Sequence, residues 1–292
     1  MGLKWLQKAK AETGLMTATE VANATHVDLA LQHDIDILWV GARTTVSPFI
    51  VQEIADAVKG TDKIILVKNP VNPDLALWLG GVERFYEAGI TKLGAIHRGF
   101  STYEKTRYRN NPEWQIPIDL QNTFPDLPLL LDPSHIAGRR DIIFDLCQTA
   151  LDLNYDGFMV ETHFDPDNAW SDAKQQITPK ALDQITKDLK IRKSEGDEAE
   201  FTNQLNILRT KIDLIDDQLM EMIGKRMKIV DNIGLLKKKS NVSILQVKRW
   251  NEVLERMISE GKHNKLSEEF VMKLYKAIHQ ESIDHQKKVM ND

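Results

Sequence analysis

Three basic side chains in the first hundred residues each accompany a short apolar run. Arg43 follows IDILWVGA, Lys68 lies near the end of KIILVKN, and Arg98 follows KLGAIH. If these runs are parallel strands of one sheet, their carboxyl ends meet at one edge and the three cations converge. Convergent Arg and Lys side chains suit a small, multiply charged anion such as a phosphate ester. The alternative is that each is an ordinary surface charge.

A second set, His135, Glu161 and Asp172, offers one imidazole and two carboxylates. That combination suits a divalent first-row metal ion, although a histidine in a DPSH segment can also be purely structural. Cys147 is the one cysteine of the 292 residues and falls on the apolar face of a predicted helix, so we assign it to the core. A single cysteine excludes an internal disulfide framework and a multi-cysteine zinc site.

The third set of cations lies in the last hundred residues and comprises Arg209, Arg226, Lys237 and Arg249. Arg226 and Lys237 are eleven residues apart, about three helical turns, so both lie on one face and can converge on one ligand. Arg209 and Arg226 lie roughly 25 Å apart on the same helix and point in different directions. Two helices of a dimer could bring them together. A solvated basic helix face is the alternative.

The elements that must position the first two sets are βα units. Six apolar runs alternate with helix-like stretches, which predicts parallel strands. A (β/α)8 barrel places its chemistry after the strands, whereas a doubly wound sheet usually carries a glycine-rich phosphate turn, and no G-x-G-x-x-G or P-loop occurs. We therefore predict an incomplete TIM-type barrel of about six βα units. Its strands are expected at 15–21, 35–42, 63–69, 92–97, 127–132 and 157–163, after an opening helix in GLKWLQKAKAET.

Composition divides the chain into an α/β part and an all-α part. All ten prolines precede residue 180, and the net charge is −8 over residues 1–199 and +3 over residues 200–292. We predict a barrel-like domain over 1–190, a linker over 191–199 and a three-helix domain over 200–292. The first helix spans roughly 38 residues, about 57 Å, which the other two, near 246–259 and 267–289, cannot cover. Pairing with a second subunit is expected.

Several classes of protein are excluded by what the sequence lacks. No apolar run approaches the ~18 residues of a membrane span, and the first residues do not resemble a signal peptide. The net charge of −5 argues against nucleic-acid binding. A cytoplasmic protein without nucleic-acid or membrane partners is expected.

The motifs of residues 1–190 are similar to those of a known enzyme family. LWVGAR, LVKN, HRGFSTYE, LDPSHIAGRRD and MVETHFDPDNAWSD together resemble the 3-deoxy-D-arabino-heptulosonate 7-phosphate (DAHP) synthases of the short bacterial type. The resemblance implies condensation of phosphoenolpyruvate with erythrose 4-phosphate. It implies that Arg43, Lys68 and Arg98 bind phosphoenolpyruvate. It also implies a divalent metal ion (Mn, Fe, Co or Zn) held by His135, Glu161 and Asp172.

Two segments of that family have no counterpart here. The family's first two strands carry a G-P-C-S segment, whose cysteine is a fourth metal ligand, and a K-P-R-T segment that grips both substrates. We therefore expect about two N-terminal βα units to be absent and the synthase half to be inactive alone. A truncated gene model, a fragment and a degraded domain all stay open.

Residues 203–287 resemble the all-helical, type II chorismate mutases. The motif L-R-x-K-I contains Arg209. The residues that follow it at the spacings of the family's site are Arg226, Lys237, Arg249, Ser282 and Gln286. The resemblance implies that Arg226 and the partner subunit's Arg209 bind the two carboxylates of chorismate, and that Lys237 and Gln286 face its ether oxygen. Arg249 and Ser282 would complete the pocket. The rearrangement to prephenate needs a dianion held in a reactive conformer and positive charge at the breaking bond, but no metal ion.

Two positions depart from that family. Gln246 and Trp250 stand where many relatives have Asp and Glu, and that Glu accepts a hydrogen bond from the substrate's ring hydroxyl. Trp250 cannot accept one, so either another residue such as Glu252 takes the role or affinity falls.

Three interpretations of the whole chain follow. The first is a bifunctional DAHP synthase–chorismate mutase of the shikimate pathway with a truncated synthase half. In the second, the helical domain is chiefly a sensor of prephenate or chorismate that regulates the synthase. In the third, the helices only join barrels into dimers, but this would not require the cations and Gln286.

Overall fold

The computed structural model describes residues 1–103, 106–193 and 199–291, and it divides the chain into two compact units, Met1–Ser194 and Glu195–Asp292. Five of the nine residues of the predicted linker, 194–198, lie outside the described residues. Within the described part, no helix combines the length and apolar character that crossing a membrane requires.

The first unit is built on one parallel sheet whose strands follow one another in chain order. Val21 pairs with Val40 in the first ladder, and Lys68 pairs with Ile96 in the third. The strands are β1 (Ala18–Val21), β2 (Ile37–Val40), β3 (Ile64–Lys68), β4 (Leu93–His97), β5 (Leu129–Leu131) and β6 (Gly157–Phe158). No ladder joins β6 to β1 among the described residues, so the sheet is an open arc.

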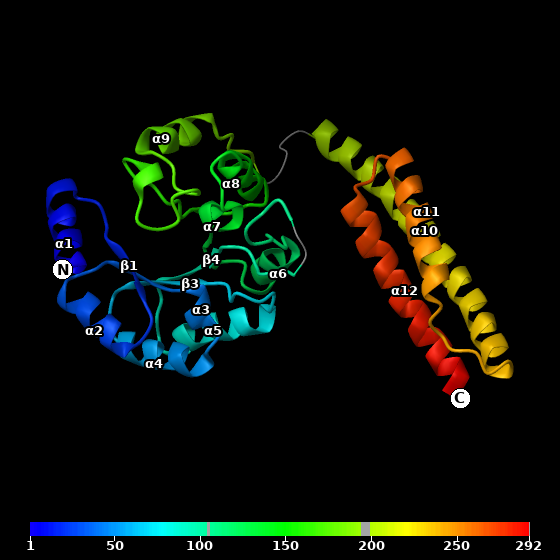
Figure 1. Cartoon of the computed structure of the whole chain (residues 1–292). Helices are drawn as coiled ribbons and strands as arrows, with labels where there is room; N and C mark the ends of the chain where they lie inside the picture. Colours follow the sequence, from blue (N-terminus) through cyan, green and yellow to red (C-terminus); the bar gives the residue numbers. More distant parts are fainter. Residues whose placement is uncertain (104–105, 194–198, 292) are drawn as a thin grey trace. The chain divides into compact units, whose positions relative to one another are not determined.

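Helices lie along the sheet, and most of them connect its strands (Figure 1). They are α1 (Gly2–Thr13), α2 (Ala24–Gln32), α3 (Ala42–Thr45), α4 (Pro48–Val58), α5 (Leu75–Glu87), α6 (Gln115–Thr123), α7 (Pro133–Ala137), α8 (Ile143–Asp152), the 3-10 turn η1 (Pro166–Asn168) and α9 (Pro179–Asp188). The expected partial barrel of six βα units is confirmed, including the opening helix. The short helices α3 and α7 were not predicted, since four or five residues show no helical period.

These short helices begin where functional side chains lie. Asp132 directly follows β5 and is the N-cap residue of α7, because its Oδ1 accepts a hydrogen bond from the backbone N–H of His135. Pro133 occupies the first turn, where its missing N–H costs nothing. Gly138 ends α7 at φ 64, a left-handed conformation that favours glycine. The DPSHIAG segment thus builds a one-turn helix that presents His135 at the strand ends.

The core of this unit contains a buried histidine. His97, the last residue of β4, is fully buried among Trp78, Phe100, Trp114 and Tyr155. Its Nε2 lies 2.7 Å from the carbonyl oxygen of Pro112, which can only accept, so Nε2 carries the proton. Nδ1 then accepts from the Tyr155 hydroxyl at 2.9 Å. Burial lowers the pKa of His97 to about 3.

This buried imidazole predicts a pH dependence of stability. The unfolded ring binds a proton below about pH 6.5 and the folded ring does not, so stability is lost as the pH falls through that value. Between pH 6 and 4.5 the contribution of His97 should fall by about 2 kcal/mol. The variant His97→Gln lacks this contribution. Between pH 6 and 4.5 its free energy of unfolding, measured with denaturant, should fall by about 2 kcal/mol less than that of the unaltered protein. Parallel pH curves for the two proteins would contradict the prediction.

The second unit consists of three helices over its described residues: α10 (Ala199–Lys239), α11 (Val247–His263) and α12 (Glu268–Asn291) (Figure 1). α12 packs against both α10 and α11. Arg226 contacts Ser282 and Asp231 contacts His285, so the contacts advance along both helices together and α10 and α12 run parallel.

Glycine allows the close approach of these helices. A Cβ on Gly234 would lie 3.2 Å from the Cα of Gln286, and one on Gly261 would lie 2.4 Å from Cγ2 of Val271. Larger side chains would therefore force α12 away from α10 and α11.

The helical unit buries little apolar surface within one chain. Its buried apolar side chains, over the described residues, are Met227, Val230 and Val271. By contrast, large apolar side chains stay exposed along most of α10, namely Phe201, Ile207, Leu208, Ile212, Leu214, Ile215, Leu219, Met220, Met222, Ile229, Ile233, Leu235 and Leu236. A helix that is apolar on its exposed faces calls for a partner.

Candidate functional sites

The carboxyl ends of the strands surround a polar pocket of about 310 Å³. Arg43, Lys68 and Arg98 all line it, so the structure brings the three predicted cations together. Glu20, Arg109, Asn110, His135 and Asp172 line it too, as do Gly41, Ala42 and Val71. A concave site of this size, rich in positive charge, suits a small anion.

Lys68 is not a free cation in this pocket. Its Nζ lies 2.7 Å from Oδ2 of Asp132, and both side chains are buried. The same Nζ lies 5.9 Å from the ring centroid of Trp39. A buried carboxylate therefore balances this charge. Of the three arginines that line the pocket, Arg109 is paired with Asp172. Arg43 and Arg98 therefore carry the excess positive charge.

Arg98 is held firmly at the end of β4. Its backbone N–H donates to Oδ1 of Asn69, and its Nη1 donates to Oδ1 of Asn110 at 2.8 Å. Burial lowers the pKa of Arg98, Asp132 opposes this shift, and the charges of Arg109 and Arg43 add to it. Like charges gathered in this way favour binding of an anion that neutralises them.

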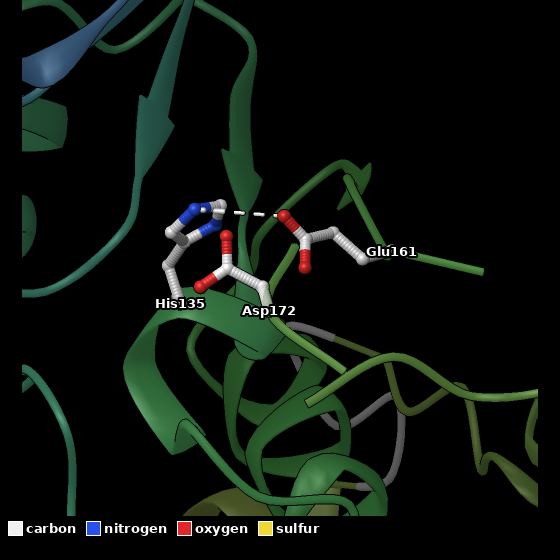
Figure 2. Close-up of side chains that lie close together, drawn as sticks. All are labelled: His135, Glu161 and Asp172. Carbon is white, nitrogen blue, oxygen red and sulfur yellow. Dashed lines mark ion pairs between the residues drawn. The ribbon is translucent and has the colours of Figure 1, made fainter. Parts of the chain in front are cut away.

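His135, Glu161 and Asp172 lie beside this cluster, and their side chains point toward one another (Figure 2). One potential ligand atom of each lies within 4.8 Å of the others. Nε2 of His135 is 3.6 Å from Oε1 of Glu161. The residues come from α7, from the segment after β6 and from the loop after η1. The structure thus unites three residues that span 38 positions of sequence.

Asp132 orients the imidazole for metal binding. Its Oδ1 and Oδ2 lie 3.0 and 2.8 Å from Nδ1 of His135, so Nε2 is the nitrogen left facing the carboxylates. A carboxylate behind a ligating histidine is the usual outer partner in metal sites. Burial raises the pKa of Asp132, but His135 and Lys68 outweigh it and hold that pKa at about 2.

The two carboxylates are positioned by Arg109 and Gln175. Arg109 Nη1 donates to Oδ1 of Asp172 at 2.6 Å and to Oε1 of Gln175 at 2.6 Å. Gln175 Nε2 in turn donates to Oε2 of Glu161 at 2.8 Å. The hydrogen bond from Arg109 lowers the pKa of Asp172. Arg109 therefore favours the ionised form of Asp172, and the carboxyl oxygens of Glu161 and Asp172 have lone pairs left for a cation.

Sequence reasoning missed five residues of this region. Glu20 could have been predicted in the same way as Arg43, because it lies near the carboxyl end of a strand, β1. Asp132 was visible as the first residue of DPSH. By contrast, Arg109, Asn110 and Gln175 lie in irregular segments, where no period or strand end points to them.

In the helical unit, Arg226, Ser282 and Gln286 form one cluster. Arg226 Nη1 donates to Ser282 Oγ at 2.6 Å, and Gln286 Nε2 donates to the carbonyl of Ser282 at 3.1 Å. Ser282 and Gln286 are buried, and Arg226 is half-buried. Oε1 of Gln286 is buried without a hydrogen-bond partner, alone in this respect among the side chains of the described residues. Such an orphaned group needs a ligand or a water molecule.

The remaining predicted cations are placed differently. Lys237 lies one turn after Gly234, its Nζ donates to the carbonyl of Ile244 at 2.5 Å, and burial lowers its pKa. Arg249 is exposed and pairs with Glu252 at 3.4 Å, so Glu252 is turned to Arg249. Arg209 is exposed on α10. Of the six residues predicted for the helical site, all of which the structure describes, only Arg226, Ser282 and Gln286 are joined to one another by hydrogen bonds within one chain.

Trp250 packs against α12. Its ring stacks on the imidazole of His279 with centroids 4.0 Å apart and planes 23° from parallel. His279 was not predicted as a site residue.

Comparison with known proteins places each part of the chain in a family. The profile of the DAHP synthetase I family matches residues 1–197. The phospho-2-dehydro-3-deoxyheptonate aldolase of Thermotoga maritima is 27% identical over 189 residues, 65% of this chain and 54% of that protein. The structure of a truncated DAHP synthase from T. maritima superposes with a TM-score of 0.58 at 27% identity, over 64% of this chain and 68% of that one. The chain belongs to the DAHP synthetase I family.

A second family is joined to it. The profile of type II chorismate mutases matches residues 208–287. The bifunctional chorismate mutase/prephenate dehydratase of Buchnera aphidicola is 35% identical over 89 residues, 30% of this chain and 23% of that protein. The chain is thus a DAHP synthase domain fused to a C-terminal type II chorismate mutase domain, and both families are enzymes of the shikimate pathway. It spans about half the length of the T. maritima aldolase.

Proposed function

We propose that the helical unit catalyses the rearrangement of chorismate to prephenate. The observation that carries the proposal is the cluster of Arg226, Ser282 and Gln286, in which a guanidinium and an unpartnered buried amide oxygen lie on facing sides of α10 and α12. A structural helix pair would bury apolar groups at this point instead.

The residue types match the chemistry. Arg226, oriented by Ser282, binds one carboxylate of the dianion through charge-assisted hydrogen bonds. Lys237 and Gln286 lie further along the same two faces, where they meet the ether oxygen as its bond breaks and gains negative charge. The lowered pKa of Lys237 follows from burial, and a half-buried ammonium stabilises such charge more strongly than an exposed one.

The test is a spectrophotometric mutase assay on the 292-residue chain. Turnover of chorismate supports an enzyme. Binding of chorismate or prephenate without turnover would instead support the second interpretation, in which the unit is a sensor for the synthase.

Chelation should leave the mutase rate unchanged. The residues proposed for this reaction are cations and neutral polar groups, and none belongs to the His135 cluster. The rate of chorismate loss, measured before and after dialysis against a chelator, should agree within about twofold, because the barrier is lowered by protein charges alone. A rate that falls on chelation and returns with Mn²⁺ would contradict the assignment.

We further propose that the helical units pair as a homodimer. The exposed apolar residues of α10 would be covered by a second copy of this helix. An antiparallel arrangement would bring Arg209 of one subunit to the Arg226 cluster of the other. Arg209 would then bind the second carboxylate, and Arg249 would complete the site after leaving Glu252.

For the first unit we propose DAHP synthase chemistry, with phosphoenolpyruvate and erythrose 4-phosphate as substrates. Arg43 and Arg98 would bind the phosphate and carboxylate of phosphoenolpyruvate, and Lys68 would take part while paired with Asp132. His135, Glu161 and Asp172 would hold the divalent ion, whose contribution when bound is Lewis-acid polarisation of an oxygen. Their donor set and the orientation of His135 by Asp132 fit such an ion.

The fourth ligand that the resemblance implies is not supplied by the one cysteine. Cys147 is buried on α8, and burial raises the pKa of its thiol to about 12. A thiol that stays protonated does not ligate a metal ion. In the described part of the chain, the synthase site therefore offers three metal-ligating residues at the edge of an open sheet.

Residues 1–292 alone should show negligible DAHP synthase activity. The expected rate is below ~1% of that of a complete relative, because the K-P-R-T clamp and thiolate ligand that the family uses have no counterpart in this sequence. Release of phosphate from phosphoenolpyruvate in the presence of erythrose 4-phosphate and Mn²⁺ measures it. Fusing an upstream segment of roughly 65–75 residues, the size of two βα units, should restore activity. Robust turnover without it would overturn this prediction.

A further inference from the structure

His279 lies on the same side of α12 as the proposed mutase site. It precedes Ser282 by three residues and Gln286 by seven, so the three side chains follow one another along one helix face. From α11, Trp250 covers the flat side of the imidazole at 4.0 Å. From α10, the charge of Arg226 reaches the ring. His279 is therefore positioned by elements that also position the site.

The ring has unused hydrogen-bonding capacity. Burial lowers the pKa of His279 and Arg226 lowers it further, so the imidazole is neutral at pH 7. A neutral imidazole has one N–H donor and one nitrogen acceptor. Across the described residues, no hydrogen bond is formed by either nitrogen, whereas the ring nitrogens of His97, His135 and His285 are engaged. A half-buried ring that is stacked on Trp250 and has no hydrogen-bond partner among the described residues is available to a ligand.

The other groups of the site are poor acceptors or are already paired. Glu252, the alternative acceptor named above, is paired with Arg249. Arg226 and Lys237 only donate, and so does the indole of Trp250. The Ser282 hydroxyl accepts from Arg226 and donates to the carbonyl of Ile278 at 2.6 Å. Gln286 Oε1 is the competing acceptor, and it lies seven residues, about two turns, further along α12.

We infer that His279 is a further substrate-contacting residue, whose ring nitrogen accepts the hydrogen bond of the ring hydroxyl of chorismate. This inference rests on the proposed mutase function. In this arrangement Trp250 orients the imidazole by stacking and does not itself bind the hydroxyl.

Comparing chorismate with an analogue that lacks the ring hydroxyl distinguishes a hydrogen-bonding role of His279 from a purely packing role. His279→Leu should lower kcat/KM for chorismate by at least ~10-fold, as expected when a hydroxyl loses its acceptor. For the analogue whose ring hydroxyl is replaced by hydrogen, the loss should stay within ~3-fold. His279→Gln, which keeps an acceptor, should retain chorismate activity within ~3-fold. His263→Leu at the exposed end of α11 is the matched control and should have no effect. Equal losses for both substrates would overturn the inference.

A second measurement uses the unaltered protein. The ¹⁵N signal of the His279 imidazole, assigned by its absence in His279→Gln, should shift when the hydroxylated bicyclic dicarboxylate that mimics the transition state is added. An unshifted signal with the ligand bound would overturn the inference but leave the mutase proposal standing. Failure of the unaltered chain both to rearrange chorismate and to bind the dicarboxylate would overturn both.

Discussion

Arg226→Ala is expected to lower kcat/KM for chorismate by at least ~100-fold, about 2.7 kcal/mol of transition-state stabilisation. The side chain is half-buried and its Nη1 donates to Ser282. Removing it takes away a charge-assisted donor and leaves Ser282 without this contact. Because a dianionic substrate depends on such donors, the loss should appear in both KM and kcat.

Two variants make the result specific. Lys225→Ala removes the neighbouring cation, which is exposed and paired with Glu221, and it should change kcat/KM by less than about twofold. Arg226→Lys keeps the charge but not the planar fork, and it should fall between the unaltered protein and alanine. If Arg226→Ala, shown to be folded by circular dichroism, lost less than tenfold, Arg226 would be only a surface charge.

Mixing two inactive variants should restore activity. Arg209→Ala and Arg226→Ala homodimers are each expected to be nearly inactive. The two residues are seventeen positions apart on α10, roughly 25 Å, so one small substrate can meet both only across two subunits. In a mixed dimer one site carries both changes and the other carries neither. Random exchange should therefore bring activity to about a quarter of that of the unaltered protein, because half of the dimers are mixed and each has one intact site.

The controls address exchange and dimerisation separately. Subunit exchange is verified with two differently tagged chains by native mass spectrometry. Mixing Arg226→Ala with Lys237→Ala, two changes in the same half-site, should bring no recovery. Absence of recovery with Arg209→Ala despite verified exchange would show that the two arginines do not serve one site.

Much of this architecture could be predicted because it depends on the local spacing of apolar residues along the chain. The apolar run KIILVKN, for example, contains β3. The expectation that functional side chains follow the carboxyl ends of parallel strands correctly placed Arg43, Lys68 and Arg98 around one pocket. Buried parallel strands are uniformly apolar, and their carboxyl ends share one edge. The three- and four-residue spacing of apolar side chains likewise predicted α10, and the eleven-residue interval placed Arg226 and Lys237 on one face of it.

Other features were decided only by the tertiary structure, because they join residues far apart in the chain. Lys68 pairs with Asp132 across 64 positions, and Arg109 reaches Asp172 across 63. Sequence spacing determines which face a side chain occupies, but long-range packing selects the neighbour it meets there. The partnership of Trp250 with His279 is of the same kind. From the sequence, Trp250 is only the loss of an acceptor; the packing of α11 on α12 shows that its ring stacks on His279, for which we propose the acceptor role.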